Sequence, residues 1–311
     1  SRKLHFEWSK RSIDARKKKV KIRCSFKVYL DDEKQPGRYE PEYSDLEKGQ
    51  SVHIIGLGPA GIFAALKALE LGIKPIVYER GKPVSERIKD IGKLNRKGVV
   101  NEESNYCFGE GGAGTYSDGK LYTRSKKRGA VREVLESFVY FGANKDILID
   151  AHPHIGTNKL PRIVSTMSDE ILKRGGEIHF ERKLTDISIN DQRITSIEIN
   201  RSEHIPVERL ILATGHSARD VFEILHKRGV KVLPKPFALG VRVEHKQEFI
   251  DISQYGKPSD EFLTPASYKL VTQVEDKGVY SFCMCPGGII APCATVPGEV
   301  VTNGWSPSKR N

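Results

Sequence analysis

The chain has 311 residues, of which 38% are apolar and 29% charged, and this balance excludes an intrinsically disordered protein while allowing two domains. No apolar run approaches the ~20 residues of a membrane span, and the first ten residues lack the apolar core of a signal peptide. The five cysteines follow no disulfide-like spacing, so we expect a reduced, cytoplasmic setting.

Most of the formal net charge of +11 lies near the N-terminus, where residues 1–27 hold eleven Lys or Arg against two acids. We expect a short helix at 9–17. Apolar and mainly basic residues alternate over 20–30, which predicts a half-buried strand with a basic solvent face. A solvated face is the favoured interpretation, with a nucleic-acid surface or an acidic partner as alternatives. Residues 31–46 are polar and contain prolines, as is typical of a linker.

Residues 51–80 carry the most specific pattern. An apolar strand leads into Gly56, Gly58 and Gly61 at G-x-G-x-x-G spacing, an amphipathic helix follows, and a second strand ends at Glu79. The glycines allow a tight turn, a close approach of phosphate to the backbone and close packing of helix on strand. The helix N-terminus favours a pyrophosphate, and the acid can bind ribose hydroxyls. The sequence therefore predicts a dinucleotide-binding unit.

Beyond this unit, residues 81–130 predict mostly loop with short helices. Helices are expected at 131–141 and 160–174, the second ending at a Gly-Gly pair. A short strand is expected at 147–149. Three alternating segments at 177–181, 184–189 and 194–200 predict an antiparallel meander with a turn at 190–192. The remaining expected elements are a buried strand at 209–213 that runs into Ala213, Thr214 and Gly215, a helix at 218–228, and strands at 237–244, 269–274 and 279–284.

This order of elements predicts the α/β class, with a Rossmann-like FAD-binding domain that contains an antiparallel meander, because a strand ending in A-T-G returns to the sheet as in two-dinucleotide-fold flavoproteins. We expect a small basic α+β segment at 1–48, the FAD-binding domain at 49–220 and a mostly β substrate-side domain at 221–311.

Five motifs occur together in the chain and resemble those of the uncharacterised FAD-dependent dehydrogenases, also described as NAD(FAD)-utilising dehydrogenases. The motifs are CFGEGGAGTYSDGKL at 107–121, HPHIGTNKL at 152–160, LATGHSARD at 212–220, PFALGVRVEH at 236–245 and CMCPGG at 283–288. Members of that family continue past residues 300–306, so the resemblance implies that this chain is truncated at its C-terminus and that its substrate-side domain is incomplete.

The resemblance implies non-covalent FAD and an oxidoreductase activity, with NAD(P)H as a transient electron donor, and it supplies no substrate. No residue has an assigned catalytic role. The residues expected to contact the cofactor are Gly56, Gly58, Pro59, Ala60, Gly61, Glu79, Arg80, Gly111, Gly112, Gly114, Ala213, Thr214 and Gly215.

Gly109, Gly111 and Gly114 repeat the G-x-G-x-x-G spacing, but no good strand precedes them and no strand ending in an acid follows. We therefore expect this loop to approach the flavin or its pyrophosphate, with polar contacts from the neighbouring residues Ser117, Asp118 and Lys120, and not to form a second nucleotide site.

Histidines and cysteines predict no metal site. His152 and His154 lack further ligands in sequence, and a pocket role for His154 is an alternative to a structural one. Cys283, Cys285 and Cys293 lack C-x-x-C spacing, so we favour a strand end and turn over a redox pair. Cys107 is expected to be a buried packing residue.

Two functions stay open. The first is an FAD-dependent oxidoreductase. The second is a non-catalytic flavin or nucleotide binder whose basic N-terminus is the working surface, RNA being one candidate partner. We expect no membrane association and favour a small-molecule substrate over nucleic acid.

Overall fold

The computed structural model describes residues 3–17, 19–31, 33, 37, 39–46, 49–123, 129–258, 262–282 and 284–306. Its central element is a four-stranded parallel sheet in the order β5 (Glu177–His179), β4 (Lys74–Tyr78), β3 (Ser51–Ile55) and β9 (Leu210–Leu212). The apolar run of β3 is buried on both faces, as expected for a central parallel strand.

Two helices cover one face of this sheet. They are α1 (Pro59–Glu70), which packs on β3 and β4, and α4 (Leu160–Lys173), which packs beside α1 and against β5. Ile54 points into this layer, where it meets Ile62 of α1 and Met167 of α4 in one buried cluster. Neighbouring side chains on a strand point to opposite faces, so Ile55 points the other way.

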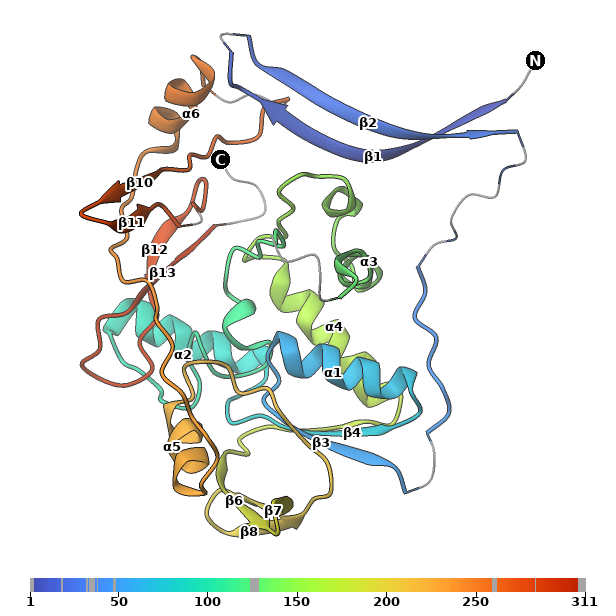
Figure 1. Cartoon of the computed structure of the whole chain (residues 1–311), viewed down its shortest axis with the longest axis vertical. Helices are drawn as coiled ribbons and strands as arrows, with labels where there is room; N and C mark the ends of the chain where they lie inside the picture. Colours follow the sequence, from blue (N-terminus) through green and yellow to red (C-terminus); the bar gives the residue numbers. More distant parts are fainter. Residues whose placement is uncertain are drawn as a thin grey trace.

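The opposite face is covered by an antiparallel meander and one helix. The meander consists of β6 (Leu184–Asn190), β7 (Arg193–Ile199) and β8 (Glu203–Pro206), and the helix is α5 (Arg219–Lys227). Ile55 packs there with Ile197 and Val221. The predicted α/β class and meander are thus present, in three layers (Figure 1).

The first meander segment is assigned differently from the prediction. β5 pairs parallel with β4 and belongs to the central sheet, and β8 is the third strand of the meander. Alternation over 177–181 cannot reveal which strand a segment pairs with, and the helix before it returns the chain to the parallel sheet. The turn at Asp191 and Gln192 is confirmed, since both residues have positive φ in a two-residue hairpin.

The region after β4, predicted to be mostly loop with short helices, contains a helix of 14 residues. This helix, α2 (Val84–Lys97), begins after Pro83 and ends at Gly98, which has a φ of 66°. Short 3-10 helices lie at Gly112–Gly114 and Lys145–Leu148, the second in place of the strand predicted at 147–149. There the Asn144 side chain accepts from the Asp146 N–H and stabilises a turn. Helix α3 (Val131–Tyr140) is confirmed.

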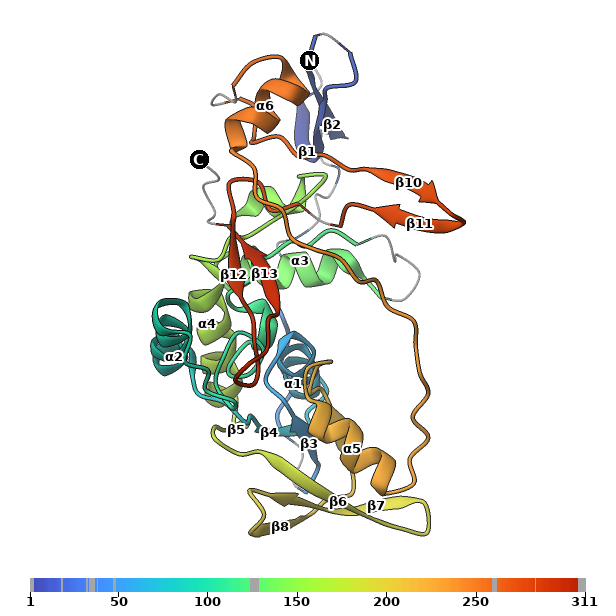
Figure 2. The same ribbon diagram turned by 90° about the vertical axis from the view of Figure 1, so that its left-hand side faces the viewer.

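The N-terminal segment is a hairpin of β1 (Leu4–Asp14) and β2 (Lys21–Leu30), so the helix predicted at 9–17 is wrong. Cross-strand pairing stabilises a strand here in place of the predicted helix. Trp8 lies opposite Phe26, and their ring centroids are 4.4 Å apart. The predicted burial is also wrong, since Phe26 is 46% and Val28 50% exposed. In Figures 1 and 2 the hairpin lies at the opposite end of the molecule from the meander.

The C-terminal third forms small elements: α6 (Gln247–Tyr255), the hairpin of β10 (Val271–Val274) with β11 (Lys277–Tyr280), and the hairpin of β12 (Ile289–Pro292) with β13 (Thr302–Trp305). The strand predicted at 237–244 is wrong. That segment has no ladder partner among the described residues, and Leu239 and Val241 are 92% and 90% exposed. It lies in the long connection between α5 and α6 (Figure 2).

The expected burial of the strand at 209–213 is wrong. β9 is present in the sheet but is not buried, because it is the edge strand and Leu212 is 38% exposed. Among the described residues, no helix has the length and apolar character to cross a bilayer. The domain boundaries at 48 and 220 stay predictions.

Candidate nucleotide-binding site

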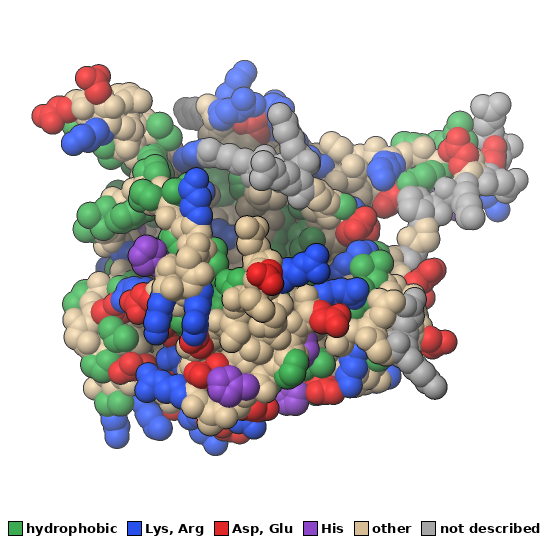
Figure 3. Space-filling view, turned by 60° about the horizontal axis from the view of Figure 1, so that its bottom comes forward, with side chains coloured by type: hydrophobic (Ala, Val, Ile, Leu, Met, Phe, Trp, Pro, Cys, Tyr) green, Lys and Arg blue, Asp and Glu red, His purple; other side chains and the backbone are tan. Residues whose placement is uncertain are grey.

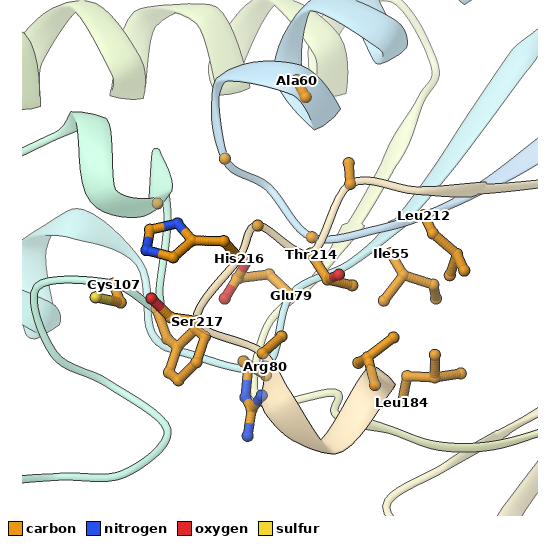
Figure 4. Close-up of a pocket in the computed structure, with 18 of the residues that line it drawn as sticks. Ile55, Ala60, Glu79, Arg80, Cys107, Leu184, Leu212, Thr214, His216 and Ser217 are labelled. Atoms are coloured by element: carbon orange, nitrogen blue, oxygen red, sulfur yellow. The ribbon is translucent and has the colours of Figure 1, made fainter. Parts of the chain in front are cut away.

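A cavity of about 580 Å³ lies at the carboxyl ends of β3, β4 and β9. The chain leaves β3 at Gly56, β4 at Glu79 and β9 at Ala213, and all three residues line the cavity. Figure 4 shows Glu79 and Thr214 there. In open parallel sheets this edge is where ligands bind. The volume is within the ordinary range for a small-molecule site.

The first glycine turn explains how α1 comes to face the cavity. Gly56 has a φ of 99°, and a Cβ there would lie 2.6 Å from the Ala213 carbonyl oxygen. A Cβ on Gly61 would lie 1.9 Å from the Gly56 carbonyl oxygen, so only glycine lets α1 approach the turn this closely. No side chain caps the α1 N-terminus at Gly58. Its first N–H groups therefore lack intrahelical partners and favour an anion.

Glu79 is buried and holds three backbone segments together. Its carboxylate accepts hydrogen bonds from the N–H groups of Leu57 at 2.7 Å, Gly81 at 2.9 Å and Gly109 at 2.9 Å. A carboxylate has about four acceptor positions, so three are used and about one is left for a ligand hydroxyl. The predicted ribose contact stays a prediction, now limited to about one hydrogen bond in addition to a structural role.

A second glycine loop forms the wall opposite α1. The Gly111 N–H donates to the Leu57 carbonyl at 2.7 Å, and a Cβ on Gly112 would lie 2.9 Å from the Gly58 Cα. Gly114 approaches Pro59 in the same way. Two glycine backbones thus face each other at the entrance to α1. No strand lies at residues 98–108, directly before Gly109. That this loop forms no second nucleotide site stays a prediction.

Arg87 of α2 fixes the shape of this loop. It is fully buried and donates to the carbonyl oxygens of Asn105 at 2.8 Å, Glu110 at 2.6 Å and Gly112 at 2.8 Å. Burial lowers the pKa of Arg87 to about 10, which leaves it protonated at neutral pH. The planar guanidinium matches three converging carbonyls in a way that a lysine cannot.

A network of charged residues lies at one side of the cavity. Arg80 contacts Glu103 at 2.6 Å and Asp220 at 3.0 Å, and Lys183 contacts the same two carboxylates at 2.7 and 3.1 Å. Burial alone would raise the pKa of both carboxyls, but hydrogen bonds from Arg80 and Lys183 outweigh it and lower both pKa values. Arg80 also covers the Phe108 ring at 4.1 Å. This network links β4, the meander and α5 around the cavity.

The other side of the cavity is apolar. Figure 4 shows Ile55, Leu184 and Leu212 grouped together, away from His216 and Ser217. The site thus has an apolar wall, an anion-favouring helix end and a glycine-lined wall, which are the surfaces that a base, a phosphate group and a flat ring system require.

The cavity wall brings together eleven of the thirteen predicted cofactor residues, and only Gly61 and Gly111 lie behind it. His152 and His154 are not in the wall, and neither are Ser117, Asp118 and Lys120. No group of three or more potential metal ligands occurs in the described part of the chain.

Sequence reasoning missed several residues of the wall. His216 and Ser217 directly follow the A-T-G motif, so that motif could have indicated them. Lys183 and Leu184 begin the meander and carried no signal. Cys107 was expected to be packing, but it is partly exposed and lines the cavity. Cys283 lies outside the described residues.

The comparisons with known proteins find a family that is described as FAD-dependent. Residues 236–311 match the family described as "FAD-dependent protein, C-terminal domain-like". An uncharacterised protein of Clostridium beijerinckii is 41% identical over 321 residues, covering 97% of this chain and 60% of the relative. The mitochondrial dihydrolipoyl dehydrogenase of Rattus norvegicus is 32% identical over 69 residues, covering 22% of this chain and 14% of the enzyme. The matched family agrees with the predicted FAD cofactor.

Solved structures show partial likeness. THI4 of Thermovibrio ammonificans is 18% identical with a TM-score of 0.39, covering 58% of this chain and 64% of that protein. CtdE in complex with FAD is 15% identical with a TM-score of 0.28, covering 55% and 40%. The chain spans about 60% of the length of the Clostridium relative.

Proposed function

We propose that this chain binds FAD in the cavity at the carboxyl ends of β3, β4 and β9 as part of an FAD-dependent oxidoreductase. One observation carries the proposal. The uncapped N-terminus of α1 and the Gly112 loop both line the cavity, and they meet at Gly58 and Gly112, where neither residue has a side chain to cover the backbone. A diphosphate needs such an arrangement, because its oxygens must reach backbone N–H groups at hydrogen-bond distance.

The ADP half of the cofactor has a suitable surface for each of its parts. The pyrophosphate would accept hydrogen bonds from backbone N–H groups at Gly58 and Ala60, at the start of α1, and would contact Pro59 between them, which has no N–H. The adenosine ribose would reach the free acceptor position of Glu79. The adenine would pack on the apolar wall that includes Leu184 and Leu212.

Bound FAD would supply hydride and electron chemistry, with a nicotinamide nucleotide as the proposed electron donor. The chain's own residues would orient it. Glu79 and Arg87 fix the two loops, and the Arg80 network closes one side of the cavity. The more specific resemblance to NAD(FAD)-utilising dehydrogenases belongs to this proposal, as does a small-molecule substrate of unassigned class.

A single added methyl group tests the site. Gly58 has a φ of −76°, and a Cβ there meets only the Gly112 Cα at 3.8 Å, so Gly58→Ala fits the protein itself. It would place carbon where the pyrophosphate must approach, and we expect FAD affinity to fall at least ~10-fold, which is about 1.4 kcal/mol. Calorimetric titration of the purified chain with FAD measures this.

The matched control is Gly240→Ala, because a Cβ at Gly240 meets nothing within 4 Å and the residue lies outside the cavity wall. FAD affinity should not change in this variant. Equal FAD affinity in both variants and the unmodified chain would contradict the proposed pyrophosphate site. The larger substitution Gly112→Val is a poor probe, since its side chain would first clash with Gly58.

A nucleotide binder without turnover is the second candidate, and the β1–β2 hairpin favours it. This hairpin is largely exposed and carries most of the net charge. On the face in Figure 3, by contrast, Lys and Arg are interspersed with Asp and Glu. Salt-sensitive RNA binding without flavin reduction by NADH or NADPH would favour this candidate. Bleaching of bound flavin by either nucleotide would favour the oxidoreductase.

A further inference from the structure

Two cysteines that are 186 residues apart in sequence meet at the edge of the cavity. The Sγ atoms of Cys107 and Cys293 lie 3.7 Å apart. Cys107 belongs to the loop before the second glycine motif and lines the cavity, and Cys293 directly follows β12. A disulfide requires an S–S distance of ~2.05 Å, so the two sulfurs are within a small side-chain movement of bonding.

Ordered backbone presents both cysteines. The Cys107 N–H donates to the Asn105 Oδ1 at 2.9 Å, and Asn105 is in turn tied to Arg87. The Cys293 N–H donates to the Val301 carbonyl at 2.7 Å, and Ala291, two residues earlier, is buried against α2. The contact therefore joins two anchored segments and is not a chance approach of loose loops.

The surroundings of the two sulfurs shift the pKa values of the two thiols in opposite directions. A hydrogen bond from Cys293 lowers the pKa of Cys107, burial opposes this, and Ser217, His216 and Arg87 lower the pKa further. The same contact and burial raise the pKa of Cys293. Cys107 is thus the more acidic thiol of the pair and forms a thiolate before Cys293 does. The thiolate is the form that attacks disulfides.

The other described cysteines are placed differently. Cys24 is exposed on β2. Cys285 contacts Lys120 at 3.1 Å. Among the described residues, only Cys107 and Cys293 form a sulfur–sulfur contact.

We propose that Cys107 and Cys293 form a redox-active dithiol that reacts with small-molecule disulfides of the glutathione class. The Cys107 thiolate attacks one sulfur of the small disulfide, forms a mixed disulfide and releases one small thiolate. Cys293 then loses its proton, attacks the Cys107 sulfur and releases the second thiolate. The balance is one protein dithiol and one small disulfide giving one protein disulfide and two small thiols.

This site goes beyond the proposed function and does not depend on FAD. Its closed form would covalently join the loop before Gly109 to the β12–β13 hairpin. The link would close a loop of 186 residues, and long loops gain the most from cross-linking. Oxidation should therefore raise the denaturant concentration at the midpoint of unfolding.

The test incubates the purified chain, without added cofactor, in a buffer of reduced and oxidised glutathione and maps its thiols by peptide mass spectrometry. We expect two of the five thiols to be lost in a single Cys107–Cys293 link. In Cys293→Ser, glutathione should accumulate on Cys107 at least ~10-fold above its level in the unmodified chain, because nothing resolves the mixed disulfide. In Cys107→Ser, Cys293 should stay reduced.

Cys24→Ser is the control and should leave the link unchanged. Absence of the link in the unmodified folded chain would overturn the proposal, and so would equal glutathione occupancy of Cys107 in the unmodified chain and in Cys293→Ser. The link itself needs no variant, so a variant that fails to fold does not remove the test. Failure of FAD titration would contradict the proposed function alone.

Discussion

The layered region from β3 to α5 and the two exposed ends of the chain use similar sequence patterns with opposite results. Ile197 of the meander and Phe26 of the N-terminal hairpin both lie on alternating strands. Ile197 is fully buried against Ile55 and Val221, whereas Phe26 is 46% exposed. Alternation therefore identifies a strand, but the presence of a second layer decides whether its apolar face forms a core.

The largest expected effect in the layered region is at Arg87. Arg87→Met removes three hydrogen bonds from a charged donor to buried carbonyls, each contributing about 1.5–3 kcal/mol, although the Glu110 and Gly112 carbonyls keep a donor on Thr115. The unfolding free energy should therefore fall by at least about 3 kcal/mol. Chemical denaturation measures this loss. Arg96→Met is the control on the same helix. Because the Arg96 side chain is exposed, its loss should change the unfolding free energy by no more than about 0.5 kcal/mol. Equal losses would show that α2 does not fix the second glycine loop.

Substitutions on β7 and β2 compare a covered strand with an exposed one. Ile197→Ala should lower the unfolding free energy by about 2–5 kcal/mol, because it opens a cavity between two layers. Phe26→Ala should cost less than about 1.5 kcal/mol, since it loses mainly one ring contact with Trp8. Denaturation midpoints of the two variants give the difference. A loss at Phe26 as large as that at Ile197 would mean that the hairpin face is covered in solution.

Much of the layered region follows from sequence because its signals are local. The glycine spacing from Gly56 to Gly61 and the acid after β4 specify a strand, turn and helix within 30 residues. The pairing of β5 and the exposure of β2 depend on distant segments, so no local pattern contains them. The contact between Cys107 and Cys293, which are 186 residues apart, depends on the most distant segments of all these features. Helix α2 was predictable in principle from Pro83 and Gly98.

A smaller effect is expected at Glu79. Glu79→Gln replaces an acceptor of three N–H groups with an amide whose NH₂ faces donors. We expect a loss of about 2 kcal/mol in unfolding free energy and FAD affinity lowered at least ~10-fold. Glu203→Gln on the exposed β8 is the control. A lower FAD affinity with an unchanged unfolding free energy in Glu79→Gln would indicate that the carboxylate contacts the ligand and has no structural role.

The smallest expected effect concerns pH. The pKa values of Glu103 and Asp220 are lowered in the folded protein, so their contribution is present above the unfolded pKa values of about 4 and is lost as pH falls toward the lowered folded values. Asp220→Asn should lower the unfolding free energy by about 1 kcal/mol at pH 7, a small value because the Asp220 side chain is partly exposed. The difference in unfolding free energy between this variant and the unmodified chain should shrink below about pH 4.

Denaturation curves at several pH values measure this difference, with Asp191→Asn in the exposed meander turn as the control. A difference between Asp220→Asn and the unmodified chain that is constant with pH would contradict an electrostatic role for the Arg80 network.

The central claim is that the cavity beside Gly56 and Gly58 selects FAD. The most direct measurement loads the purified chain with equal concentrations of FAD and NAD, removes unbound nucleotide, denatures the protein and identifies what is released by mass spectrometry. We predict that FAD is recovered from the unmodified chain and is much reduced in Gly58→Ala. Recovery of NAD in place of FAD would contradict the account.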